Sequence, residues 1–167
     1  MKSMFNELPS PPIEFSVASV LVRFIDAIGF RFFLATKGLK DTEFDFRPVE
    51  GSMNMLELLD HMHKVLRWAY KACGGLSENA HPSIGPEYVT SFLDLCMDFK
   101  EVVSRMNDEQ LQAITIYLKR TDSQYSLWYL INGPLADVMT HIGQINSWRR
   151  MAGNPIDSIS PFTGEPF

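Results

Sequence analysis

Asp137 and His141 are the residues of this chain whose types and spacing most clearly suggest chemistry, because they stand four positions apart in a segment of helical periodicity. Side chains at i and i+4 lie on one face of an α-helix, about 5–6 Å apart at Cβ. At that separation they can share one divalent cation. The neighbouring apolar residues Leu135, Val138 and Ile142 place the pair at the edge of the buried face. A metal site and a simple Asp–His hydrogen bond both fit these residue types.

Three further histidines could supply another ligand. His61 and His63 flank Met62 in a second segment of helical periodicity, and each lies on one shoulder of its apolar stripe. The periodicity alone does not choose between them. His81 precedes Pro82 in a polar stretch, where a solvated loop histidine is expected. The obvious catalytic motifs, a glycine-rich phosphate loop, GxSxG and HExxH, are absent from the sequence.

The composition limits the class of protein to which this chain of 167 residues can belong. With 15 Lys and Arg against 20 Asp and Glu, its net charge of −5 lacks the basic footprint of a nucleic-acid binder. No stretch reaches the roughly 18 apolar residues of a membrane helix, and residues 1–12 lack the apolar core of a signal peptide. Cys73 and Cys96 form no CxxC motif and are expected to be free buried thiols of a cytoplasmic protein.

Four segments in which apolar residues recur every three or four positions predict the helices that must position these side chains. The predicted ranges are about 16–37, 52–73, 86–106 and 123–152. Gly38 should end the first helix, Ser52 should cap the second, and Pro134 should kink the fourth. The β-branched segment 111–118 could form a short strand. We therefore expect an all-α fold, a single-domain four-helix bundle over residues 1–167 with a long connection between its third and fourth helices.

The aromatic and basic residues of the fourth predicted helix have structural explanations. Trp128, Tyr129 and Trp148 are expected in an aromatic core rather than in a substrate pocket. Arg149 and Arg150 fall late in the helix, where positive charges interact favourably with the negative end of the helix dipole.

Two segments of the chain resemble the DinB-like (DinB/YfiT) superfamily. Residues 47–61 resemble the start of that family's second helix, which carries an L-x-x-H motif that here ends at His61. Residues 132–155 contain Asp137-Val-Met-Thr-His141-Ile-Gly-Gln144, followed by two arginines and a glycine. The family typically shows H-x-x-x-H-x-G-Q before an arginine-rich run and Gly. The order and spacing of the predicted helices also agree, so the resemblance covers nearly the whole chain.

The resemblance implies one divalent metal ion held by His61, Asp137 and His141. Asp137 departs from the family, because a histidine is commoner at its position. A carboxylate still binds divalent cations, and it adds a negative charge. Two histidines and one carboxylate suit Zn or Ni best and are compatible with Fe or Mn. Gln144, one turn beyond His141, is expected to contact the ligand set from outside it, whereas Asp60 is expected to face water.

The family resemblance also implies the kind of activity. Three protein ligands leave positions open for water or substrate, as catalytic metal sites require. We expect a metal-dependent enzyme acting on a small molecule, either a thiol S-transferase that uses a low-molecular-weight thiol such as bacillithiol or mycothiol, or a hydrolase. The alternative is a non-catalytic, stress-linked bundle that binds a structural metal or dimerises. No nucleic-acid or membrane partner is expected.

The first predicted helix suggests a homodimer. Its apolar residues wrap more than one face, and a helix that is apolar all round needs burial on more than one side. These residues are Phe24, Ile25, Ile28, Phe30, Phe32 and Phe33. Alternatively, the N-terminal segment or the C-terminal tail of the same chain covers the second face.

Overall fold

The protein is mostly helical, with one small two-stranded sheet. The computed structural model describes residues 5–76, 87–119, 121–160 and 162–166. Its elements, in chain order, are α1 (Val17–Thr36), the 3₁₀ turn η1 (Asp41–Glu43), α2 (Met55–Ala72), α3 (Glu87–Ser104), α4 (Asp108–Gln112), β1 (Thr115–Leu118), β2 (Ser123–Ser126), α5 (Leu127–Leu130), the π-helical turn η2 (Ile131–Leu135) and α6 (Ala136–Met151). No helix in these ranges is both long and apolar enough to cross a membrane.

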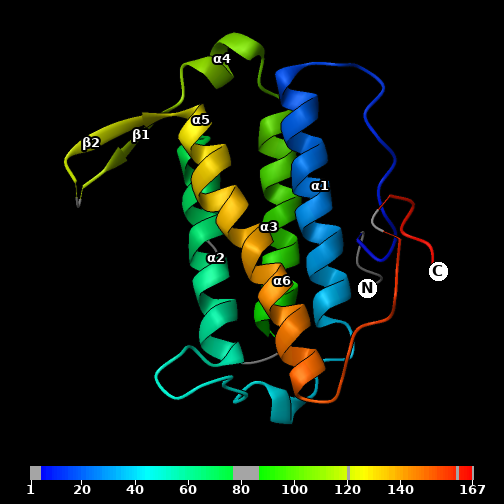
Figure 1. Cartoon of the computed structure of the whole chain (residues 1–167). Helices are drawn as coiled ribbons and strands as arrows, with labels where there is room; N and C mark the ends of the chain where they lie inside the picture. Colours follow the sequence, from blue (N-terminus) through cyan, green and yellow to red (C-terminus); the bar gives the residue numbers. More distant parts are fainter. Residues whose placement is uncertain (1–4, 77–86, 120, 161, 167) are drawn as a thin grey trace.

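Four long helices of the described chain, α1, α2, α3 and α6, run side by side (Figure 1). Helices α1 and α2 each pack against both α3 and α6. Fully buried side chains from all four helices fill the space between them, among them Ile28, Met62, Phe99 and Val138. The all-α prediction is confirmed in this coarse form, and the apolar periodicity found the helices because each buries an apolar face between the others.

The helix termini follow capping chemistry, and one predicted cap is wrong. Gly38 ends α1 with a φ of +72°, as its residue type predicts. Asn54, rather than Ser52, caps α2. The Asn54 side chain accepts from the amide of Glu57 at 2.8 Å, and the Glu57 carboxylate accepts from the amide of Asn54 at 2.8 Å. This reciprocal pair satisfies two helix-end donors, whereas the Ser52 hydroxyl donates to the carbonyl of Val49.

The connection between α3 and α6 is long, as predicted, but its elements differ from the prediction. The extended segment predicted at 111–118 begins only at Thr115, because Asp108–Gln112 forms the short helix α4. Ser123–Ser126, predicted as the start of the fourth helix, is instead strand β2, paired antiparallel with β1. Ile116 in β1 is buried while both its neighbours are exposed, which is the alternation of a strand with one covered face. The hairpin projects from the helices (Figure 1).

The distortion predicted at Pro134 takes the form of the π-helical turn η2. Proline lacks an amide hydrogen and its ring crowds the carbonyl four residues earlier, so a wider turn accommodates it within a continuous helical path. Leu127 and Leu130 form the buried face of α5. Trp128 and Tyr129 lie between them on the other side of the helix and are 75% and 58% exposed, so their predicted place in the core is wrong. Trp148 is half-buried and packs against the core, as expected.

Both terminal segments lie along α1 (Figure 1). Phe5 is fully buried against Gly29, where a Cβ would come within 2.5 Å of the phenyl ring. In the C-terminal tail, Gly164 fits closely against Phe30 and Leu8. The chain's own ends thus cover part of the second apolar face of α1, around Gly29 and Phe30, which is the alternative that the sequence left open. Val17 and Val20 at the start of α1 remain exposed. The homodimer stays a prediction.

Arg149 ties the end of α6 to the end of α1. Its buried guanidinium donates to the carbonyls of Ala35 at 2.9 Å and Lys37 at 2.8 Å, and its Nε donates to the carbonyl of Asn154 at 3.1 Å. Burial lowers the pKa of Arg149, an effect that the Glu43 carboxylate opposes. The sequence predicted only that Arg149 would interact with the negative end of its own helix dipole. It did not predict the hydrogen bonds from Arg149 to the carbonyls at the end of α1, which lack partners within their own helix. Arg150 is exposed.

Candidate metal centre

His61, Asp137 and His141 come together between α2 and α6. Nε2 of His61 lies 3.3 Å from Oδ2 of Asp137, and Nε2 of His141 lies 3.4 Å from Oδ1 of the same carboxylate. The two imidazole rings meet edge to face, with centroids 4.9 Å apart. One ligand atom from each residue lies within 4.8 Å of the other two, so the group could hold one metal ion. The residues named from the sequence therefore share one site.

His63 lies elsewhere, although it is only two positions from His61. It is buried, with its Nε2 2.9 Å from the hydroxyl of Ser91 on α3, and its ring meets that of Tyr88 edge to face. Two residues along a helix turn the side chain by about 200°, so one histidine faces α6 and the other α3. His81 lies outside the described residues.

Gln144 fixes the orientation of the His141 ring. Its side-chain carbonyl oxygen lies 2.8 Å from Nδ1 of His141, one turn away on α6. A carbonyl oxygen can only accept, so Nδ1 carries the hydrogen and a neutral His141 presents the lone pair of Nε2 to the cluster. Metal-binding histidines are typically held in this way by a partner on the other ring nitrogen. The contact expected of Gln144 is confirmed.

The distances within the cluster are compatible with a cation held between the three side chains. With its Nδ1 hydrogen donated to Gln144, a neutral His141 directs a lone pair at a carboxylate oxygen of Asp137 only 3.4 Å away. Two facing acceptors repel each other unless a proton or a metal ion lies between them. Direct charge-assisted N–H···O bonds are shorter, about 2.7–2.9 Å. Two ligands of a tetrahedral ion with bonds of about 2.0–2.1 Å stand about 3.3–3.4 Å apart. The two histidines lie at that distance from different oxygens of Asp137, and the three ligand atoms lie within 4.8 Å of one another.

The cluster is open to solvent on one side. The side chains of His61 and Asp137 are 36% and 44% exposed, whereas that of His141 is 15% exposed. The exposed edge leaves space for a water molecule or a substrate beside the three protein groups. Open positions of this kind distinguish catalytic metal sites from closed structural ones.

A polar cavity of about 430 Å³ adjoins the His61 side of the cluster. Two ion pairs line it, Arg47 with Glu57 at 3.0 Å and Lys64 with Asp60 at 2.5 Å. Asp60 also accepts a hydrogen bond from the Tyr88 hydroxyl at 3.1 Å, so the expectation that it simply faces water is wrong. The sequence could not show this contact, because Tyr88 comes from α3.

Neither cysteine belongs to the site. Cys73 and Cys96 are free and buried, as predicted. Burial raises the pKa of Cys73 to about 11, and burial together with the nearby Asp26 carboxylate raises that of Cys96. A thiol must ionise to act as a nucleophile or a metal ligand. Any thiol chemistry at the cluster would therefore need an external thiol.

Comparison of the chain with protein-family models, curated proteins and solved structures finds no match. The DinB-like resemblance thus stays a prediction that depends on the motifs ending at His61 and beginning at Asp137.

Proposed function

We propose that this protein is a DinB-like four-helix bundle that binds one divalent cation through His61, Asp137 and His141. The observation that carries the proposal is the convergence of the three side chains, whose ligand atoms all lie within 4.8 Å of one another. Gln144 holds the ring in the tautomer that leaves Nε2 free for a metal. A divalent cation bound between Nε2 of His141 and the Asp137 carboxylate would complete the site.

Two imidazoles and one carboxylate form a donor set that suits Zn or Ni best and accepts Fe or Mn. The carboxylate offsets one of the two positive charges of such an ion. His61 and His141 supply neutral nitrogen donors, so the site keeps a net positive charge that attracts an anionic ligand such as a thiolate or hydroxide. This charge balance favours an enzyme over a purely structural site.

We propose that the reaction is transfer of an external thiol to a small electrophile, or hydrolysis of a small molecule. A divalent cation in this site would lower the pKa of a thiol or water bound beside it. In the thiol reaction, the sulfur lone pair forms a bond to an electrophilic carbon, the bond from that carbon to its leaving group breaks, and the thiol proton passes to solvent. Asp137 and the two histidines hold the reacting group at the open edge, and Gln144 keeps His141 from rotating.

The direct test is conjugation of a low-molecular-weight thiol to monochlorobimane, followed by fluorescence, with protein loaded with Zn or Ni. We expect turnover that disappears on chelation and in His141→Ala. Ser147→Ala is the matched control, because its hydroxyl donates to a carbonyl of its own helix and it is exposed. Metal binding without turnover across several thiols, electrophiles and ester substrates would contradict the enzyme and favour a non-catalytic, metal-binding module.

A further inference from the structure

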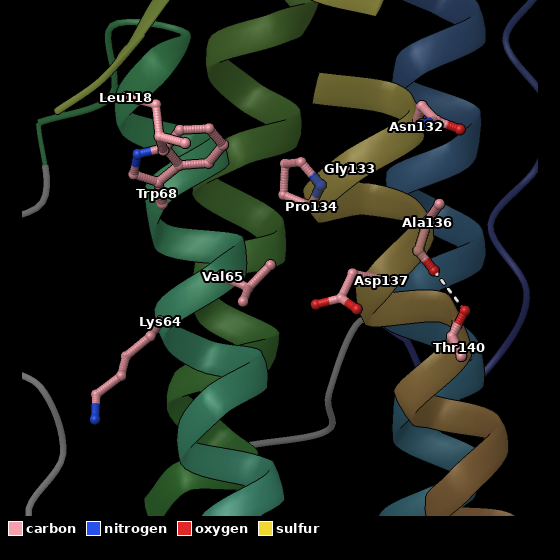
Figure 2. Close-up of a pocket in the computed structure, with 10 residues that line it drawn as sticks. All are labelled: Lys64, Val65, Trp68, Leu118, Asn132, Gly133, Pro134, Ala136, Asp137 and Thr140. Carbon is pink, nitrogen blue, oxygen red and sulfur yellow. Dashed lines mark hydrogen bonds between the residues drawn. The ribbon is translucent and has the colours of Figure 1, made fainter. Parts of the chain in front are cut away.

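A cavity of about 660 Å³ opens on the Asp137 side of the cluster (Figure 2). It lies between α2 and the stretch formed by η2 and the start of α6, and the hairpin contributes Leu118 to its wall. Its volume falls within the range of about 300–1,000 Å³ that is typical of small-molecule sites. The hairpin and the π-helical turn, which have no part in the metal cluster itself, thus both help to form this cavity.

The wall of this cavity is mainly apolar. Trp68 and Val65 come from α2, Leu118 from β1, and Pro134 and Ala136 from the opposite side. Figure 2 shows the indole of Trp68 beside Leu118, with Val65 directed into the gap between the helices. An indole face and a proline ring are surfaces on which a flat ring can stack.

The polar lining residues leave little to attract an ionic ligand. Lys64 is directed away from the gap (Figure 2), and its ammonium pairs with Asp60. The hydroxyl of Thr140 donates to the carbonyl of Ala136 at 3.0 Å. Among the described lining residues, Asp137 carries the single carboxylate, and its side chain is directed into the gap. In the metal-free protein an anion would therefore meet a like charge, and an uncharged ligand would not.

We infer that this cavity binds an uncharged aromatic small molecule of two or three rings and presents it to the metal cluster. The inference rests on the proposed function, because Asp137 both lines the cavity and belongs to the cluster. A ligand stacked on Trp68 has its other edge at Asp137, next to the open positions of the site. The substrate class is thus an apolar aromatic electrophile, or an aromatic ester if the reaction is hydrolysis.

The probe for this inference is N-phenylnaphthylamine, an uncharged fluorophore that brightens in apolar surroundings, titrated into the full chain in the presence of a chelator. We expect saturable binding that Trp68→Ala weakens about tenfold or more, because the stacking surface is lost. Trp128→Ala is the matched control, since Trp128 is exposed and does not line the cavity. The anionic relative anilinonaphthalene sulfonate should bind about tenfold more weakly, because its charge would approach Asp137.

A second measurement avoids any dependence on the folding of Trp68→Ala. The chain has 3 tryptophans, so replacing Trp128 and Trp148 by Phe leaves Trp68 as the single reporter. Its emission should be quenched as the naphthylamine binds. Equal affinity in Trp68→Ala and in the natural protein, or an unquenched Trp68 at saturation, would overturn the inference.

Metal titration separates this inference from the function on which it rests. Binding of Zn without any binding of the naphthylamine overturns the cavity and leaves the metal site standing. Binding of the naphthylamine without any binding of Zn supports the cavity as a ligand site and overturns the metal-dependent enzyme. If both bind, Mn²⁺ in the site should broaden the proton signals of the bound probe, and His141→Ala should abolish the broadening. Sharp probe signals in the Mn²⁺-loaded natural protein would place the probe elsewhere and overturn the inference.

Discussion

Replacement of Gln144 tests the link between ring orientation and metal affinity. Gln144→Met keeps the length and much of the volume of the side chain but removes the oxygen that accepts from Nδ1 of His141 at 2.8 Å. The ring then loses the bond that fixes its tautomer. A typical net hydrogen bond contributes about 0.5–1.5 kcal/mol, and loss of such a partner typically lowers metal affinity about 10–100-fold. We expect Zn affinity to fall within that range, which corresponds to about 1.4–2.8 kcal/mol.

Gln144→Glu tests the same contact in the opposite direction. A carboxylate in place of the amide accepts a charge-assisted hydrogen bond, which is roughly twice as strong as a neutral one. The Zn affinity should therefore equal or exceed that of the natural protein. Isothermal titration of Zn into the natural protein, both variants and Ser147→Ala gives the four dissociation constants, and circular dichroism checks that all four are folded. Equal affinity in Gln144→Met and the natural protein would refute the argument from the His141 tautomer.

Three further predictions concern the ligand set and the scaffold. Asp137→Asn should weaken Zn binding, because a neutral amide oxygen is a poorer ligand, whereas Asp137→His should still bind a metal and favour nitrogen-preferring ions such as Ni. Full Zn binding by Asp137→Asn, together with loss of Zn binding in Asp137→His, would remove Asp137 from the ligand set. Arg149→Met should lower the free energy of unfolding, measured by urea denaturation, by roughly 2–4 kcal/mol, because buried carbonyls lose a charged donor. Arg150→Met replaces an exposed neighbour and should change the free energy of unfolding little. Equal effects of the two substitutions would contradict the assigned contact. Cys73 and Cys96 should react with iodoacetamide at about pH 8 roughly 100-fold or more slowly in the folded protein than in the urea-unfolded protein. The reason is that a pKa raised to about 11 leaves little thiolate on Cys73, and burial does the same for Cys96. Fast labelling of the folded chain, followed by mass spectrometry, would contradict this.

Local sequence patterns predicted the features that arise within one helix. The spacing of Asp137 and His141 places both on one face of α6, and Gln144 follows on the next turn, so their mutual contacts depend on helix geometry alone. The end of α1 at Gly38 likewise depends on the conformation of one residue. Apolar periodicity located the long helices for the same reason, since each buries an apolar face between the others.

Features that depend on contacts between distant elements were not predicted. Periodicity could not choose between His61 and His63, because both flank the apolar stripe and the choice depends on which neighbouring helix each one faces. The pairing of Ser123–Ser126 with β1 was missed, since a polar segment before a helix carries no strand signal of its own. The burial of Arg149 depends on carbonyls more than a hundred residues away, and no local pattern in α6 indicates them.

Metal content after purification without chelators is the most direct test of the proposed site, compared among the natural protein, His61→Ala and His63→Ala. Elemental analysis of the natural protein should give close to one divalent ion per chain. His61→Ala should lose most of that ion, because one of three protein ligands is gone. His63→Ala should keep it, because His63 faces Ser91 rather than the cluster. Metal-free natural protein that also fails to take up added Zn or Ni, or a site emptied by His63→Ala and retained in His61→Ala, would contradict the metal centre described above.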